Sequence, residues 1–126
     1  MNSPIVGRGE VYEDSAAVIL ARISDAAGAT ISQATVSAVN YEVWQKNGTA
    51  AVITTTALTV NTVCYTALQT NATMWTVDDT GYNFKHTLGT NILTTANTQY
   101  VIQYNFTMVS GDVFPVQFEL TTRKVY

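Results

Sequence analysis

The last quarter of the chain alternates between apolar and polar residues with a period of two. The apolar positions of its first run are Tyr100, Ile102, Tyr104, Phe106 and Met108. The turn signal Ser110-Gly111-Asp112 follows, and the apolar positions of the second run are Phe114, Val116, Phe118 and Leu120. Because successive side chains of a strand point to opposite faces, these runs predict a long antiparallel hairpin. Pro115 lies early in the second run, which indicates an edge strand or the start of a strand.

Shorter segments upstream carry related patterns. Residues 16–23 are a strand candidate, and residues 25–29 have the composition of a turn. Residues 35–45 alternate again, which predicts a second strand. The dipeptide Asn47-Gly48 follows, and Asn-Gly between two β-prone runs favours a tight hairpin turn. We therefore expect a returning strand over residues 49–55.

The remaining segments add strands rather than helices. Residues 82–86 are a further strand candidate, preceded by a turn at Gly81. Residues 58–68 have the apolar spacing of a short helical turn, but their threonines are poor helix formers. About seven short strands separated by turn signals predict an all-β, antiparallel two-sheet sandwich.

Size and charge exclude several classes of protein. The 126 residues fit one domain, and a hydrophobic content of 47% is enough for a core. Only 12% of the residues are charged, and the net charge of −3 lacks the clustered cations of a nucleic-acid-binding surface. No apolar run reaches the roughly 18 residues that span a bilayer, so we expect no membrane partner. The first residues lack the apolar core of a signal peptide, so we expect synthesis in a cytoplasm.

The first fifteen residues show little periodicity. They carry early turn signals and several acidic residues, which predicts an extended N-terminal arm over residues 1–15 and a β-domain over residues 16–126. The apolar residues of such an arm are candidates for contact with a neighbouring subunit. They are Ile5, Val6, Val11 and Tyr12.

Residues capable of catalysis or metal binding are scattered. His86 is the one histidine and Cys64 the one cysteine, too few ligands for a zinc site. The pair Asp78-Asp79 precedes Gly81 without the alternating oxygen ligands of a calcium loop, which is typical of a turn. No phosphate-binding glycine loop or hydrolase elbow occurs. The sequence predicts a protein that is not an enzyme, with no catalytic residue, no metal and no cofactor.

Two tryptophans are candidate anchors of an interface. Trp44 falls on the polar face of its predicted strand, beside Asn40 and Glu42, and Trp75 lies in a less regular segment. Tryptophan is common at the centre of protein interfaces. An exposed row of aromatics would instead suit stacking on sugars, for which Trp44, Trp75 and Tyr82 are the candidates.

Several motifs resemble those of immunoglobulin-like domains. The segment from Thr98 to Ile102 is similar to the T-x-Y start of strand F in fibronectin type III and related domains, where the tyrosine forms a corner by bonding to the backbone. Here that residue is Tyr100, with Leu93 upstream. The wider pattern, over residues 16–124, resembles small immunoglobulin-like proteins of tailed-phage virions, and in kind the N-terminal domain of phage baseplate upper proteins.

The resemblance implies a structural protein of the virion. Its expected role is a capsid decoration or cement protein, or a neck or tail accessory, present in many copies or as a homo-oligomer. Its expected partners are other virion proteins, contacted through the arm and the sheet edges, which recruit partner strands readily. The alternative is a carbohydrate-binding or host-adhesion module on the virion.

Overall fold

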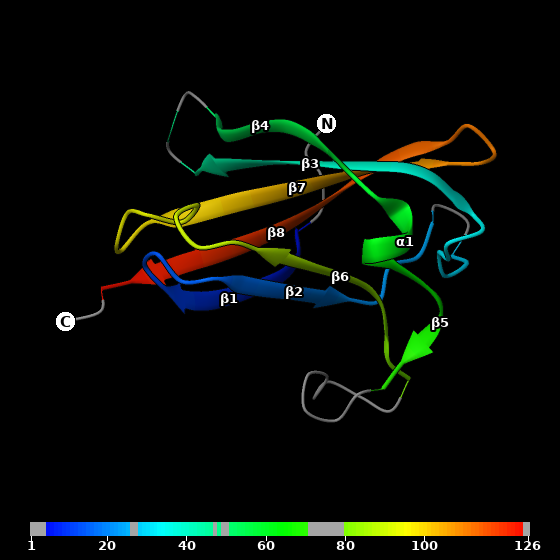
Figure 1. The fold of residues 1–126 in the computed structure, drawn as a ribbon, viewed down its shortest axis with the longest axis horizontal. Helices are drawn as coiled ribbons and strands as arrows, with labels where there is room; N and C mark the ends of the chain where they lie inside the picture. Colours follow the sequence, from blue (N-terminus) through cyan, green and yellow to red (C-terminus); the bar gives the residue numbers. More distant parts are fainter. Residues whose placement is uncertain (1–4, 26–27, 47, 49–50, 71–79, 125–126) are drawn as a thin grey trace.

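A computed structural model describes residues 5–25, 28–46, 48, 51–70 and 80–124 of the chain. Its elements are β1 (Ile5–Tyr12), β2 (Ala17–Ala21), β3 (Val36–Gln45), β4 (Ala51–Leu58), α1 (Val60–Val63), β5 (Cys64–Gln69), β6 (Tyr82–Leu88), β7 (Gln99–Met108) and β8 (Val113–Arg123). One sheet has the order β1-β8-β7-β3-β4, and the other has the order β2-β6-β5. In Figure 1 α1 lies in the right half of the picture, where the chain passes from β4 to β5. The prediction of an all-β, two-sheet fold is confirmed.

The predicted C-terminal hairpin is confirmed and supplies much of the core. β7 and β8 pair antiparallel from Gln99↔Thr121 to Thr107↔Val113. Gly111 has a φ of +100°, and its N–H donates to the carbonyl of Met108, which closes the turn. The inward side chains of β7 are all buried, and they pack with those of β8 and of the other sheet into one cluster. The buried members on the hairpin are Tyr100, Ile102, Tyr104, Phe106, Met108, Val116, Phe118 and Leu120.

The expected N-terminal arm is not confirmed, because Ile5–Tyr12 forms strand β1 of the five-stranded sheet. β1 pairs with β8 in register from Gly7↔Phe118 to Tyr12↔Arg123. Its inward positions are occupied by Gly7, Gly9 and Val11, so two of the three carry no side chain. The apolar alternation that identifies a half-buried strand is therefore missing from the sequence, although the backbone pairs as a strand does.

The expectation that all strand pairs are antiparallel is wrong for this sheet. β1 runs parallel to β8, whereas the other neighbours pair antiparallel, so the five-stranded sheet is mixed. A parallel pair needs a long connection between its strands, and here nearly the whole chain lies between them. Hairpin signals report only on strands that follow one another closely, so they carry no information about this pair.

Among the described residues, Pro115 has a strand partner on one side of β8. It faces Asn105 of β7, and the pairing with β1 begins further along, at Gln117. Because proline has no N–H to donate, it fits a position before the described pairing with β1 begins. The prediction of a position near the start of a strand is confirmed, although β8 as a whole is not an edge strand.

One buried amide connects β6 to the segment that follows β2. The side chain of Asn83 is 1% exposed and makes three hydrogen bonds with backbone groups. Its Oδ1 accepts from the N–H of Ile23 at 2.8 Å, and its Nδ2 donates to the carbonyls of Ile23 and Ile31 at 2.9 and 3.0 Å. The polar backbone next to the core is satisfied in this way, as buried polar groups require.

Candidate binding surfaces

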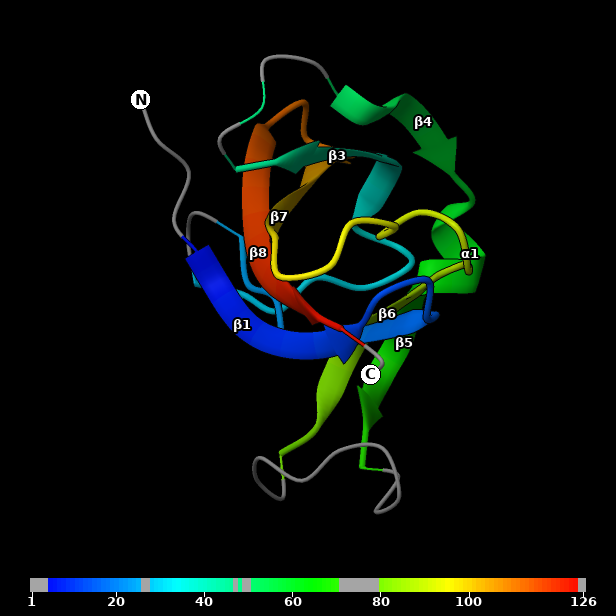
Figure 2. The ribbon, with the colours of Figure 1, turned by 90° about the vertical axis from the view of Figure 1, so that its left-hand side faces the viewer.

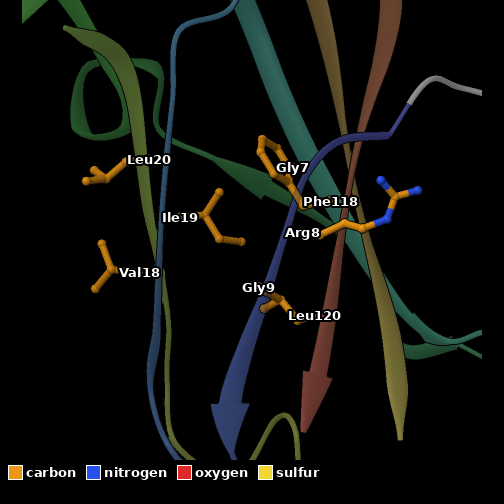
Figure 3. Close-up of a pocket in the computed structure, with 8 residues that line it drawn as sticks. All are labelled: Gly7, Arg8, Gly9, Val18, Ile19, Leu20, Phe118 and Leu120. Atoms are coloured by element: carbon orange, nitrogen blue, oxygen red, sulfur yellow. The ribbon is translucent and has the colours of Figure 1, made fainter. Parts of the chain in front are cut away.

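A hollow of about 180 Å³ opens between the first strand of each sheet (Figure 3). Its lining residues are Gly7, Arg8, Gly9, Val18, Ile19, Leu20, Phe118 and Leu120, and we call it the edge hollow. In Figure 3 Ile19 projects from β2 toward β1, whereas Val18 and Leu20 project to the other side of β2. Figure 2 shows the five-stranded sheet curling from β4 toward β1, which brings β1 to the layer that contains β2. The edge hollow is therefore a gap between the edge strand β1 of one sheet and the edge strand β2 of the other.

The two glycines of β1 leave the edge hollow unfilled and let the backbone of β1 lie close to side chains of β8. A Cβ atom at Gly7 would lie 3.2 Å from Cδ1 of Phe118, and one at Gly9 would lie 3.3 Å from Cδ2 of Leu120. Both distances are tighter than ordinary carbon–carbon contact. A larger residue at either position would push against core side chains and fill the space next to them. Glycine at these positions therefore allows the backbone of β1 to approach the side chains of Phe118 and Leu120.

Both strands that border the edge hollow are edge strands. β1 is the outermost strand of its sheet, and β2, with the uncharged sequence AVILA, is the outermost strand of the other. Within the part of the chain that the structure describes, each has a strand partner on one side, so the peptide groups of its other side face away from the sheet. Val18 is 51% exposed on β2. An uncharged edge beside an apolar hollow has the features of a site that accepts an additional strand.

Of the four apolar residues predicted to contact a neighbouring subunit from the arm, the structure describes the side chains of two, and these two differ in their surroundings. Val11 packs against the core, and Tyr12 is 60% exposed at the end of β1. Ile5 belongs to β1 by its backbone pairing with Gln117, but its side chain and that of Val6 lie outside the described residues. Trp75 also lies outside the described residues. Of the two candidates in β1 whose side chains are described, Tyr12 presents its side chain to solvent.

Trp44 lies on the outer face of the five-stranded sheet and is half-buried there. Strand register places Trp44 of β3 opposite Val101 of β7. Val101 lies opposite Glu119 of β8, and Glu119 lies opposite Arg8 of β1. Opposite residues of paired strands share a face, so these four side chains form one row across the sheet. A shallow depression runs along this row, lined by Trp44, Gln45, Lys46, Gly48, Val101, Gln103 and Gln117.

Beside this row, four amide side chains from three strands form a continuous chain of hydrogen bonds. Gln117 Nε2 donates to Gln103 Oε1, and Gln103 Nε2 donates to Asn105 Oδ1, each at 2.9 Å. Asn105 Nδ2 in turn donates to Asn40 Oδ1 at 2.9 Å. We call the surface formed by these four amides, Trp44 and Val101 the amide face. Its polar groups are held in place by one another rather than by water alone.

A buried carboxylate lies at the border of the amide face. Glu119 is 6% exposed, with Lys46 Nζ at 3.4 Å and Arg8 Nε at 4.0 Å from its two oxygens. Two cations thus compensate a charge that would be costly to bury alone. The sequence shows Glu119 as an ordinary polar position of a strand, and only the register reveals its partners.

His86 takes part in packing and in one hydrogen bond. Its Nδ1 lies 2.7 Å from the hydroxyl of Tyr104, and its ring meets that of Tyr41 edge-on at a centroid distance of 4.7 Å. Desolvation lowers the pKa of His86, and burial raises that of Tyr104. Cys64 is buried, and burial raises the pKa of its thiol to about 11. Among the described residues, no group of three or more potential ligands is placed to hold a metal ion, and Asp78 and Asp79 lie outside them.

The hydroxyl of Tyr100 bonds to the backbone of the loop before β7. Tyr100 is fully buried, and its hydroxyl accepts from the N–H of Thr95 at 3.0 Å. Leu93 of the same loop is also fully buried. Thr122 of β8 closes the other side of the loop by donating to the carbonyl of Thr95. The loop before β7 is thereby fixed to the end of β8.

Comparison with known proteins adds no assignment. No protein-family model, curated protein or solved structure gives a significant match to the chain. No helix among the described residues has the length and apolar character needed to cross a membrane. The two surfaces described above therefore carry the functional argument.

Proposed function

We propose that the chain is a non-enzymatic interaction protein that binds a neighbouring subunit through the edge hollow. The observation that carries this proposal is the hollow itself, bordered by two edge strands of different sheets. An extended segment of a partner can add to the free edge of β2 and place alternate side chains in the hollow, against Ile19 and Phe118. Main-chain hydrogen bonds supply affinity in this mode, and the hollow selects the size of the side chains.

The strand order supports an immunoglobulin-like assignment. If β2 to β8 are taken as strands B, C, C′, D, E, F and G, one sheet becomes G-F-C-C′ and the other B-E-D. Variable-type immunoglobulin domains have these strands in the same order; their strand C″ has no counterpart among the described residues, and β1 lies beside strand G. The corner hydrogen bond of Tyr100 near the start of strand F agrees with it. In such domains function lies in loops, faces and edges, so the fold by itself names no reaction.

The setting that we propose is the virion of a tailed phage. The chain would act there as a decoration, neck or tail protein, present in many copies. A symmetric particle offers repeated sites, so modest contacts at each edge hollow add up through avidity. The low share of charged residues, 12%, suits broad contacts with neighbouring subunits.

The test compares two lysine substitutions on two different edge strands. Val18→Lys places a charge on the free edge of β2, and Val52→Lys, at a 38% exposed position of β4, is the matched control. Charged edge residues block the addition of a strand. We expect purified particles to contain the wild type and the Val52→Lys variant, and to lose the Val18→Lys variant. Particles that contain no copy of the protein, or that retain a folded Val18→Lys variant at full occupancy, would contradict the proposal.

A further inference from the structure

The outer face of the five-stranded sheet carries polar groups in a regular grid. The row of Trp44 and Val101 is followed along the strands by Gln117 and Gln103, paired across β7 and β8, and then by Asn105 and Asn40, paired across β7 and β3. An outward sheet face needs no hydrogen bonds among its side chains, since water can satisfy them. Here the four amides bond to one another in sequence, so their positions and orientations are fixed in advance.

Each amide in the chain retains unused hydrogen-bonding capacity. A primary amide has two donor hydrogens and two acceptor lone pairs, and the internal bonds use at most one of each pair. Gln103 therefore offers one N–H and one lone pair, and its neighbours offer similar sets. A row of groups that each donate and accept can pair with the hydroxyl groups of a sugar, each of which also donates and accepts.

An indole lies next to this row. Trp44 is half-buried beside Val101 and borders the same shallow depression as Gln103 and Gln117. The π-face of tryptophan carries partial negative charge and attracts the weakly positive C–H groups of a sugar ring. An apolar platform beside a few fixed polar groups is the general composition of a small-molecule site.

The charges around the face balance. The positive residues are Arg8 and Lys46, and the negative ones are Glu119, which contacts both, and Glu42, which accepts from the Thr55 hydroxyl at 3.3 Å. Two positive and two negative side chains give a formal charge of zero. Such a surface has no net attraction for an anion or a cation, so the favoured ligand is uncharged.

From these observations we infer that the amide face binds a neutral carbohydrate chain. Trp44 stacks on one sugar ring, and Gln103 and Gln117 hydrogen-bond the hydroxyl groups of that ring or the next. Asn105 and Asn40 extend the polar row toward a further residue of the saccharide. The site is on a different surface from the edge hollow, so sugar binding and subunit binding are independent properties.

The test begins with a panel of neutral and charged oligosaccharides, followed by titration of the best ligand into the full chain. Trp75→Phe leaves Trp44 as the one tryptophan, so its fluorescence reports occupancy. We expect a neutral saccharide to bind with little dependence on salt.

Trp44→Ala should weaken binding at least roughly tenfold, because it removes the stacking platform. Gln103→Ala should weaken it severalfold, because it interrupts the amide chain. Val113→Ala, at a 65% exposed position on the same sheet, is the matched control and should bind as the wild type does.

Several results would overturn the inference. These are the absence of binding to every neutral saccharide at millimolar concentration, binding restricted to charged glycans, and binding that survives Trp44→Ala in a folded protein. A protein partner held at Trp44 in place of a glycan would also overturn it. Val18→Lys should leave sugar binding unchanged, so a failure of the subunit-binding proposal is distinguishable from a failure of this one.

Discussion

Replacing Asn83 tests whether a single buried amide holds the segment after β2 in place. Its three hydrogen bonds involve the backbone of Ile23 and Ile31 only. In Asn83→Ala the N–H of Ile23 loses its partner in a region closed to water. The carbonyl of Ile23 keeps a hydrogen bond from the N–H of Ile31, whereas the carbonyl of Ile31 loses the amide donor.

The magnitude follows from these two losses. A buried polar group left without a partner costs about 1–3 kcal/mol, so two such groups cost about 2–6 kcal/mol. A domain of this size has a free energy of unfolding of about 5–15 kcal/mol, so the variant should remain folded but be clearly weakened. Asn61→Ala, at an exposed position of α1, removes an amide without such bonds and should change stability by about 0.5 kcal/mol or less.

Asn83→Asp sharpens the test, because it changes charge while keeping shape. An ionised carboxylate would face the carbonyls of Ile23 and Ile31, which are 2.9 and 3.0 Å from the present Nδ2. Repulsion and burial would raise the pKa of the new carboxyl group, and protonation would restore one donor. The free energy of unfolding of Asn83→Asp, relative to Asn83→Ala, should therefore increase as the pH falls toward 4.

Urea unfolding followed by circular dichroism, at a series of pH values, measures all three variants. A cost below about 1 kcal/mol for Asn83→Ala would contradict the assignment of these bonds. So would a difference between Asn83→Asp and Asn83→Ala that does not depend on pH.

Three further predictions concern titration, the corner tyrosine and the thiol. Burial lowers the pKa of His86 below its ordinary value of 6.5, so on acidification the unfolded chain takes up a proton before the folded one does. The free energy of unfolding should therefore fall as the pH drops below about 6.5. This dependence of the free energy of unfolding on pH should vanish in His86→Gln. Tyr100→Phe removes the acceptor of the Thr95 N–H and should lower stability by about 1–2 kcal/mol in urea, whereas an unchanged midpoint would mean that water replaces the hydroxyl. Cys64 is buried and burial raises its pKa to about 11, so a thiol reagent at pH 8 should react rapidly only after unfolding; rapid labelling of the native protein would contradict its burial.

The elements predictable from sequence are those whose pattern is local. The hairpin of β7 and β8 and the strand β3 have a two-residue alternation that burial confirms. Within residues 58–68 the helical part is limited to Val60–Val63, and Cys64–Gln69 forms the strand β5. β1 has no such pattern, because glycine occupies two of its inward positions, and its parallel partner lies at the other end of the chain.

The candidate surfaces were only partly predictable for the same reason. The polar positions Gln103 and Asn105 are visible as one face of a predicted strand, but their hydrogen bonds to Gln117 and Asn40 depend on the register of neighbouring strands. The edge hollow depends on where two separate sheets end. A Gly-x-Gly pair inside a strand-length segment is the one local signal for it, since glycine in a strand often marks a close approach.

The pairing of β1 with β8 has a consequence for the order in which the protein folds. The hydrogen bond from Arg123 to Glu10 joins residues 113 positions apart. During synthesis β1 therefore cannot pair until β8 has been made. Contacts at such separation form late and slow the folding of β-proteins. Until β8 leaves the ribosome, the segment that becomes β1 stays unpaired and open to chaperones or to another nascent chain. A stalled chain that ends before residue 113 would therefore hold its N-terminus accessible to protease, and release of the full chain would protect it.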